Sequence, residues 1–320
     1  MSQDADYGKS GMGWAGGAYR PVGELAIPVT DMGFQLSDMC YDAVHVRNGK
    51  FFRLTDHLDR FDHSLNVRRY DRFEDSSGNL GPLTRVRVHE ILNGCVARAG
   101  LKDSMITFLA TRGTPAGARK DLRTATNRFM AWAVPYHGIT TDEEMAGGCD
   151  LIIPETIRIP HAAVDPTVKN FGRLDFVRAL YEAYDRGGDY ALLLDTDGYL
   201  TEGRGWNIFV LKDGRLLSPD RGVLEGVTRK TVIEIAAKMN IEASLARITP
   251  DDIKSADEAF LSSTAGGVMP VRSVDGQSIG AGDAPGPVTQ RMTDLYWALH
   301  DDPAYATPVD YAAGDAAAAE

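Results

Sequence analysis

Residues 200–209 read Leu-Thr-Glu-Gly-Arg-Gly-Trp-Asn-Ile-Phe. Glu202 ends a short strand-like run, and two glycines, Gly203 and Gly205, follow it. Glycine carries no side chain, so the backbone here can approach a flat, bulky group closely. A salt-bridged strand end explains the same residues about equally well. The stretch therefore indicates a candidate site without assigning a function to it.

Short strands joined by glycine turns surround this stretch and recur in the first half of the chain. Two-residue Asn-Gly and Asp-Gly loops between apolar runs favour β-hairpins. We expect three such hairpins, which join 41–46 to 50–54, 192–194 to 199–202, and 208–211 to 215–218.

Helical and strand-like patterns complete the predicted fold. Apolar residues at helical spacing predict helices over 56–65, 83–99, 174–184 and 228–239, and strand-forming runs cover 105–111 and 128–134. The fold class is therefore mixed α/β (α+β mixed) with many antiparallel pairs. We expect an N-terminal α/β domain over 1–134, a loop between domains over 135–139, and a barrel-like C-terminal domain over 140–320. Residues 1–19 and 311–320 offer little to bury and are expected to be flexible.

Composition excludes several classes of protein. The 320 residues carry 34 Lys and Arg against 45 Asp and Glu, a net charge of −11. An acidic chain does not suit nucleic acid or an anionic membrane as a partner, because both bind clustered Lys and Arg. Cys40, Cys95 and Cys149 are widely spaced and match no metal-ligand pattern. We expect reduced thiols, a cytoplasmic location and no metal site.

Three further segments are chemically suggestive, and each has a plain structural explanation. Residues 165–175 read Asp-Pro-Thr-Val-Lys-Asn-Phe-Gly-Arg-Leu-Asp, and they place Lys169 just before a predicted helix. A single lysine is usually a solvated surface amine. Val227 and Thr228 lie at a predicted helix N-terminus, where free N–H groups attract phosphate. Thr264 lies in a loop rich in hydroxyls and glycine. Helix capping and turn formation account equally well for these threonines and glycines.

Taken in order, these motifs resemble the fold-type IV (class IV) pyridoxal-phosphate aminotransferases. The similarity runs from about residue 16 to residue 308 and is greatest to the (R)-selective amine transaminases. Motifs that carry it include Asp31-Met-Gly-Phe34, Tyr41-Asp42, Asp56-His57, Asp165-Pro-Thr-Val-Lys-Asn170, Gly226-Val-Thr-Arg229 and Thr264-Ala-Gly-Gly267. The resemblance implies two domains, a homodimer, and pyridoxal 5′-phosphate bound in the crevice between the domains.

The resemblance also implies roles for individual residues. Lys169 would bind the cofactor covalently and then carry a proton to and from the substrate carbon. Glu202 would pair with the pyridine nitrogen and keep it protonated. The remaining cofactor-binding residues would be Arg60, Val227, Thr228 and Thr264 around the phosphate, with Asn207 fixing the loop after Glu202.

Departures from the family pattern concentrate in the expected substrate pocket. Arg173 stands where those transaminases commonly carry Trp, Arg204 where a small residue is usual, Leu36 where a His is usual, and Met105 where an aromatic is usual. The mobile arginine of those enzymes corresponds to Ala118 or Arg119. The expected pocket also includes Tyr41, Trp206 and Ala265. Arg173 is expected either to attract a substrate carboxylate or to point outward or pair with a local Asp such as Asp175.

The function expected from the resemblance is transfer of an amino group from an (R)-amine or D-amino acid to a 2-keto acid such as pyruvate. The alternatives on the same fold are a branched-chain amino acid aminotransferase and an aminodeoxychorismate-lyase-like enzyme. A non-catalytic binding protein and a cofactor-free hydrolase are more remote alternatives. Neither of these two alternatives would explain why Lys169, Glu202 and Arg60 occur together in the family's pattern.

Overall fold

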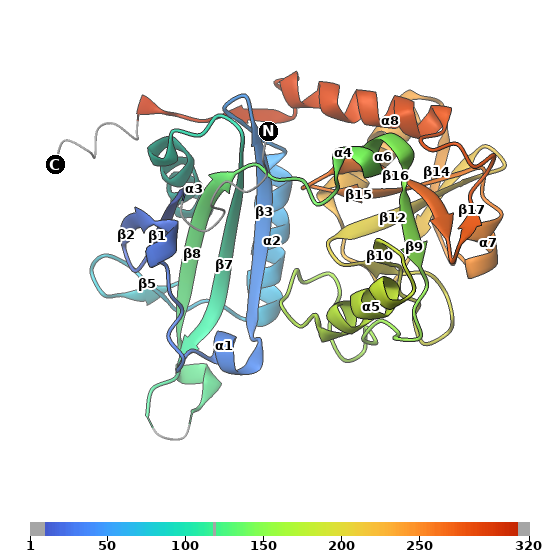
Figure 1. Cartoon of the computed structure of the whole chain (residues 1–320). Helices are drawn as coiled ribbons and strands as arrows, with labels where there is room; N and C mark the ends of the chain where they lie inside the picture. Colours follow the sequence, from blue (N-terminus) through green and yellow to red (C-terminus); the bar gives the residue numbers. More distant parts are fainter. Residues whose placement is uncertain (1–9, 118–119, 313–320) are drawn as a thin grey trace. The chain divides into compact units, whose positions relative to one another are not determined.

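Two compact units make up the computed structural model, which describes residues 10–117 and 120–312 (Figure 1). Unit 1 contains residues up to 137 together with 168–172 and those from 300 onward, and unit 2 contains 138–167 and 173–299. The division differs from the predicted domains in two places. Residues 168–172 and 300–312 belong to unit 1, although they were expected in the C-terminal domain. They belong to unit 1 because Asn170 forms a bridge with Cys40 and residues 306–308 pair with residues 50–52.

The elements of unit 1 form one mainly antiparallel sheet and two long helices. The strands on the main path follow the order β18-β4-β3-β7-β8-β1-β2. The elements are β1 (Met12–Ala15), β2 (Ala18–Pro21), η1 (Val22–Glu24), α1 (Met32–Leu36), β3 (Met39–Arg47), β4 (Lys50–Phe52), α2 (Leu54–Arg68), β5 (Phe73–Glu74), β6 (Leu80–Gly81), α3 (Arg85–Ala99), β7 (Ser104–Thr114), η2 (Leu122–Thr124), β8 (Thr126–Pro135) and β18 (Ala306–Pro308).

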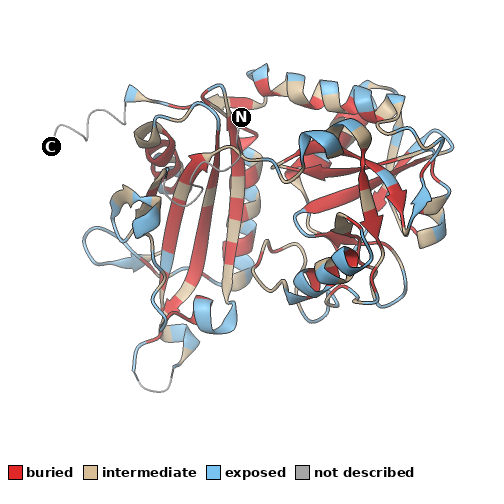
Figure 2. Cartoon of the chain, in the orientation of Figure 1, coloured by how far each residue is buried: buried red, intermediate tan, exposed pale blue. Residues whose placement is uncertain are grey.

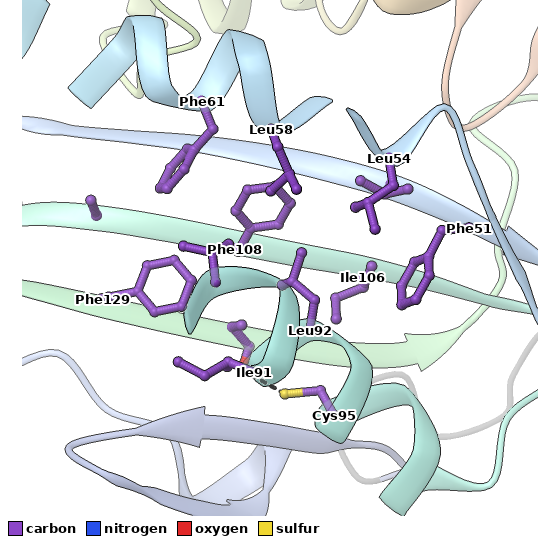
Figure 3. Close-up of a cluster of buried hydrophobic side chains, with 14 of the residues drawn as sticks. Phe51, Leu54, Leu58, Phe61, Ile91, Leu92, Cys95, Ile106, Phe108 and Phe129 are labelled. Carbon is purple, nitrogen blue, oxygen red and sulfur yellow. Dashed lines mark hydrogen bonds between the residues drawn. The ribbon is translucent and has the colours of Figure 1, made fainter. Parts of the chain in front are cut away.

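The core of unit 1 lies between helices α2 and α3 and one face of the sheet (Figure 3). Phe61 of α2 packs edge-on against Phe108 of β7, with ring centroids 4.8 Å apart. Leu92 of α3 and Ile106 of β7 are fully buried in the same cluster. In Figure 2 the central strands are mostly buried, whereas the outer faces of the helices are exposed.

The hairpin predicted around Asn48-Gly49 is confirmed. Strands β3 and β4 pair antiparallel, and both turn residues have positive φ, 50° and 70°. Positive φ at both central residues is the geometry that favours Asn-Gly. Strand β18 pairs with the other edge of β4, and its Thr307 lies opposite Phe51.

Part of the predicted flexible ends is ordered. Strand β1 pairs with β2 and with β8, so residues 12–15 and 18–21 belong to the sheet of unit 1. At the other end, the Tyr311 hydroxyl donates to the carbonyl of Leu101 at 2.6 Å. The rest of that prediction, for residues 1–9 and 313–320, lies outside the described residues. The prediction failed at 12–19 because β1 pairs with β8, which is distant in sequence, and β2 pairs with β1.

Unit 2 is a second mixed sheet with helices packed on it. Its main strand order is β10-β9-β16-β15-β12-β13-β14. The elements are α4 (Asp142–Gly147), β9 (Cys149–Ile152), α5 (Leu174–Asp185), β10 (Tyr190–Ala191), β11 (Glu202–Gly203), β12 (Trp206–Lys212), β13 (Arg215–Pro219), α6 (Val227–Lys238), β14 (Glu242–Ala246), α7 (Pro250–Lys254), β15 (Glu258–Ser263), β16 (Gly267–Val274), β17 (Gln277–Ser278) and α8 (Pro287–Ala298), with η3 (Leu299–Asp301) at the return to unit 1.

The two hairpins predicted in unit 2 have different outcomes. Strands β12 and β13 pair around Asp213-Gly214 as predicted. The hairpin predicted over 192–202 contains one isolated bridge, between Leu194 and Leu200, instead of two regular strands. Backbone hydrogen bonds still join its arms, because Thr201 N–H donates to the carbonyl of Leu193 at 2.9 Å and Leu193 N–H to that of Glu202 at 3.3 Å.

Candidate active site

Unit 1 holds Lys169 beside the start of strand β3. The backbone N–H of Tyr41 donates to the carbonyl of Lys169 at 2.9 Å, and Cys40 and Asn170 form an antiparallel bridge. The Lys169 amine lies 4.7 Å from the centroid of the Tyr41 ring, within cation–π distance. The half-buried lysine is therefore fixed against a strand edge, unlike a freely solvated surface amine.

Arg60 is held next to this strand by a buried carboxylate. Its Nε and Nη2 each donate to Asp42 at 2.8 Å, a two-point contact that fixes the plane of the guanidinium. Nδ1 of buried His57 lies 2.8 Å from the same carboxylate. Because Asp42 is completely buried and these partners come from α2, the group is a rigid part of unit 1.

Neighbouring groups determine which members of this cluster are charged. Burial of Asp42 opposes its ionisation, but the charge of Arg60 and the bonds from Arg60 and His57 outweigh burial and hold the pKa of Asp42 below its ordinary value. Burial is the largest effect on His57 and lowers its pKa, although Asp42 acts in the opposite direction. The Lys169 charge lowers the pKa of His57 further. An ionised Asp42 and a neutral His57 follow at neutral pH.

Other predicted residues of unit 1 lie in different surroundings. Met105 is buried in β7 opposite His45, which is four residues along β3 from Tyr41. Four residues of extended strand correspond to about 13 Å. Leu36 ends α1 and is 61% exposed. Arg119 and Ala118 lie outside the described residues.

Unit 2 holds Glu202 in a network of buried donors. One carboxylate oxygen, Oε2, accepts from the backbone N–H of Leu224 at 2.9 Å and from Nδ2 of Asn207 at 3.2 Å. The other, Oε1, accepts from Nη2 of Arg158 at 3.3 Å. Glu202 is 5% exposed, so its position is set by these donors and by the pairing of β11 with β12. The arrangement suits a negatively charged group held in one orientation.

Arg158 links Glu202 to a second buried acid. Its Nη1 donates to Oδ2 of Asp175 at 2.6 Å, and its guanidinium lies 4.2 Å from the centroid of the Phe176 ring. Ile159 N–H also donates to Oδ2 of Asp175 at 3.0 Å. The two acids and one arginine leave one net negative charge in this buried group. Asp175 therefore pairs with Arg158, the local partner that the sequence analysis did not consider.

The predicted phosphate segment begins directly beside this network. Asn207 Nδ2 also donates to the carbonyl of Leu224, and an added side chain at Gly226 would lie 2.1 Å from Asn207 Oδ1. Gly226 is therefore required by close approach, and it is the N-cap of α6 with no side chain capping the helix. Val227 and Thr228 are buried in the first turn. Backbone N–H groups at an N-terminus of this kind can bind phosphate.

The loop that contains Thr264 and Ala265 is tied to the glycine turn after Glu202. The Ser263 hydroxyl donates to the carbonyl of Gly205 at 2.8 Å. Both loop residues are half-buried. The structure thus brings Glu202, Asn207, Thr264 and Ala265 together in unit 2.

The remaining predicted pocket residues of unit 2 differ in exposure. Trp206 is buried, with its ring against Gly203, where an added side chain would lie 2.1 Å from the indole. Its Nε1 has no hydrogen-bond partner in the described structure. Arg204 is exposed in the turn. Arg173 is half-buried at the N-cap of α5, and its guanidinium lies 6.0 Å from the Phe176 ring centroid.

Four contributors were missed or set aside in the sequence analysis. Asp42 and His57 were noted only within motifs of the family resemblance, Asp175 was considered only as a partner of Arg173, and Arg158 was not singled out. No usable signal for Arg158 existed in the sequence, because the alternation Ile157-Arg158-Ile159 is also the ordinary pattern of a strand with its polar side in solvent.

Comparison with known proteins assigns the class. The model of the amino-transferase class IV family matches residues 39–274, and the chain belongs to this family. It is a pyridoxal-phosphate-dependent aminotransferase of fold type IV.

Individual relatives narrow the comparison. The chain is 31% identical over 252 residues to a branched-chain-amino-acid aminotransferase of Pseudomonas aeruginosa, and the match covers 78% of each protein. It is 29% identical over 273 residues to the Escherichia coli enzyme of that name, with 81% of each covered. The solved structure of the T.th. branched-chain amino acid aminotransferase with pyridoxamine 5′-phosphate is 30% identical, has a TM-score of 0.85, and covers 94% of this chain and 99% of its own.

The buried charge of Asp175 leads to a stability prediction. Replacing Asp175 with Asn removes one of the two charged acceptors of Arg158 and leaves Glu202 as its remaining acid. Losing a hydrogen bond between charged groups in this way is expected to cost about 1.5–3 kcal/mol. We expect a lower midpoint of chemical unfolding. As a control, Asp121→Asn breaks the pair with Arg123, whose side chain is 90% exposed, and should leave the midpoint unchanged. Equal midpoints for wild type and D175N would contradict the assigned role of Asp175.

Proposed function

We propose that this aminotransferase moves the amino group of an aliphatic amino acid to a 2-keto acid, with branched-chain amino acids as the main donors. The observation that carries the proposal is the similarity to branched-chain aminotransferases, which extends over 94% of the chain in the comparison with the pyridoxamine 5′-phosphate complex. The named relatives from Pseudomonas aeruginosa and Escherichia coli support the same substrate class.

The residues present fit the cofactor of this class. Unit 1 offers a fixed lysine and an immobilised guanidinium, and unit 2 offers a buried carboxylate and an uncapped helix N-terminus. Bound pyridoxal phosphate supplies an aldehyde that takes up the donor's amino group and a ring that withdraws electrons from the substrate carbon. In this proposal Lys169 holds the cofactor, Arg60, Val227, Thr228 and Thr264 bind its phosphate, and Asn207 fixes Glu202.

The chain's own groups would then carry out the proton transfers. Lys169, once released by the donor, would remove a proton from the substrate α-carbon with its Nζ and return it to the cofactor. Glu202 would accept the pyridine N–H and hold that proton in place. Its three buried donors keep the carboxylate oriented, so little reorganisation is needed during the reaction.

A second donor class is favoured by the sequence motifs. The stretch Asp165-Pro-Thr-Val-Lys-Asn170 resembles the (R)-selective amine transaminases, which supports (R)-amines or D-amino acids as donors. Measuring kcat/KM with L-leucine, D-alanine and (R)-1-phenylethylamine tests the choice. We expect L-leucine to give the highest value. A higher value for D-alanine or the amine would overturn the branched-chain proposal and leave the aminotransferase assignment intact.

Arg173 is the proposed carboxylate-binding residue of the pocket. A guanidinium paired with a carboxylate contributes about 1.5–3 kcal/mol, or about 10- to 100-fold in kcat/KM. We expect Arg173→Ala to lower kcat/KM for amino acid donors by this factor and to leave a neutral amine donor within about threefold. The matched variant Arg178→Ala removes an exposed arginine from the same helix. Equal losses for charged and neutral donors in R173A would exclude carboxylate binding.

We also propose a cytoplasmic homodimer. The support is the three buried cysteines, all free, and the family resemblance described above. Within the described residues, no helix has the length and apolar character needed to cross a bilayer. Light scattering of the purified protein should give a mass close to twice 34.8 kDa, and a monomer mass would reject the dimer.

A further inference from the structure

A cavity rich in arginine lies in unit 1, and none of the residues assigned to the cofactor lines it. Its volume is about 570 Å³, and its lining includes five arginines, Arg68, Arg69, Arg72, Arg112 and Arg123. They come from the end of α2, the segment before β5, strand β7 and helix η2. A concentration of positive charge of this kind is unexpected in a chain with a net charge of −11.

One arginine builds the wall of this cavity. Nε of Arg112 donates to Oδ2 of Asp38 at 2.7 Å, and its Nη2 donates to the carbonyl of Arg68 at 2.7 Å. The guanidinium stacks 4.4 Å from the Tyr70 ring centroid. Arg112 therefore closes the end of α2 against β7 and is committed to structure.

Two of the other arginines, Arg69 and Arg72, have a charge that is available to bind an anion. Arg72 uses Nε on the carbonyl of Ala125 at 3.2 Å, and Arg69 is exposed in a left-handed conformation after α2. Among residues 10–117 and 120–312, neither has a carboxylate within ion-pair distance. Arg123 pairs with Asp121 at the surface.

The numbers of positive and negative groups around the cavity indicate the charge of the ligand that suits it. Five guanidinium groups face three carboxylates that line the cavity or pair with its arginines, Asp38, Asp71 and Asp121, so two positive charges are uncompensated. Leu80, Leu122 and Ala125 add an apolar part to the lining. Guanidinium groups pair with carboxylate and phosphate oxygens in a planar, two-point geometry.

We propose that this cavity binds a small organic dianion, with carboxylate or phosphate groups on Arg69 and Arg72 and its carbon skeleton on the leucines. The site lies within unit 1 and does not rest on the proposed donor or on amino transfer. A ligand bound here would contact Leu122, Arg123 and Ala125, which line the cavity.

Calorimetric titration of the holoenzyme tests the site with three probes: glutarate, valerate and inorganic phosphate. Glutarate carries two carboxylates on a short chain and should bind, whereas valerate has one charge fewer and should bind at least tenfold more weakly. Binding of phosphate alone would indicate a phosphate-selective site, and binding of glutarate alone a dicarboxylate site. Absence of binding by both dianions would overturn the proposal.

Variants locate the binding and separate it from the cofactor site. We expect R69Q/R72Q to weaken glutarate binding at least tenfold, while R69K/R72K, which keeps both charges, stays within about fivefold of wild type. The matched control is Arg215→Gln, which removes an arginine paired with Glu242 on the surface of unit 2. Unchanged binding in R69Q/R72Q, or an equal loss in R215Q, would refute the cavity as the site. The thermal midpoint of each variant verifies that it is folded.

Discussion

Replacing Lys169 with alanine should lower the rate of amino transfer at least about 1,000-fold. The variant loses both the amine that binds the cofactor and the group that moves the proton, and covalent and general-base contributions of this size are usual. Reduction with borohydride should attach the cofactor permanently to the wild-type chain and not to the variant. Added methylamine should restore part of the rate in K169A, because a free amine can replace the missing proton carrier.

The control for this experiment is Lys50→Ala. Lys50 also lies on unit 1, where its amine pairs with Asp301 at 3.0 Å, and its loss should leave the rate within about twofold of wild type. An undiminished rate in K169A without added amine would refute the assignment of Lys169.

Replacing Glu202 with glutamine should lower kcat about 100- to 1,000-fold while the cofactor remains bound. Glutamine keeps the shape and can still accept from the backbone N–H of Leu224, but it removes the negative charge that holds the pyridine proton. The phosphate-binding residues are untouched, so the affinity for cofactor should change much less than kcat. The absorbance of the bound cofactor between pH 6 and 9 should also differ from that of wild type.

Two companion variants make the Glu202 result specific. Glu202→Asp keeps the charge and should recover at least tenfold of the lost rate. Glu242→Gln removes an exposed acid from strand β14 and should have no effect on kcat. If E202Q retained wild-type kcat and an unchanged cofactor spectrum, the assigned role of Glu202 would be rejected.

Local sequence patterns were sufficient for helices α2, α3, α5 and α6 and for the strands of two hairpins. The helix predicted over 174–184 is α5, Leu174–Asp185, and the one predicted over 228–239 is α6, Val227–Lys238. These predictions succeed because an apolar stripe and turn chemistry act over a few residues. Strands β1 and β2 were missed because β2 pairs with β1, and the other partner of β1, strand β8, lies more than 100 residues away.

The residues of the candidate site were likewise predicted only in part. The resemblance named Lys169, Glu202 and Arg60, because motifs around a reactive residue are contiguous in the chain. Apart from Asn207, which donates to Glu202, it did not reveal the residues that hold them in place. Asp42 orients Arg60 across 18 residues, and Arg158 reaches Glu202 across 44. Such pairs are invisible to periodicity, since burial and long-range packing decide which acid a buried arginine meets.

The amino-acid sequence by itself determined the class of enzyme, the hairpins at Asn48-Gly49 and Asp213-Gly214, and the lysine and glutamate expected to do the chemistry. Only the tertiary structure decided that residues 168–172 join unit 1, where Lys169 is anchored to Tyr41 of β3. It also decided that an acidic chain gathers five arginines around one cavity. The physical reason is that turns and helices form from neighbouring residues, whereas strand edges and charge clusters depend on segments that meet only when the chain folds.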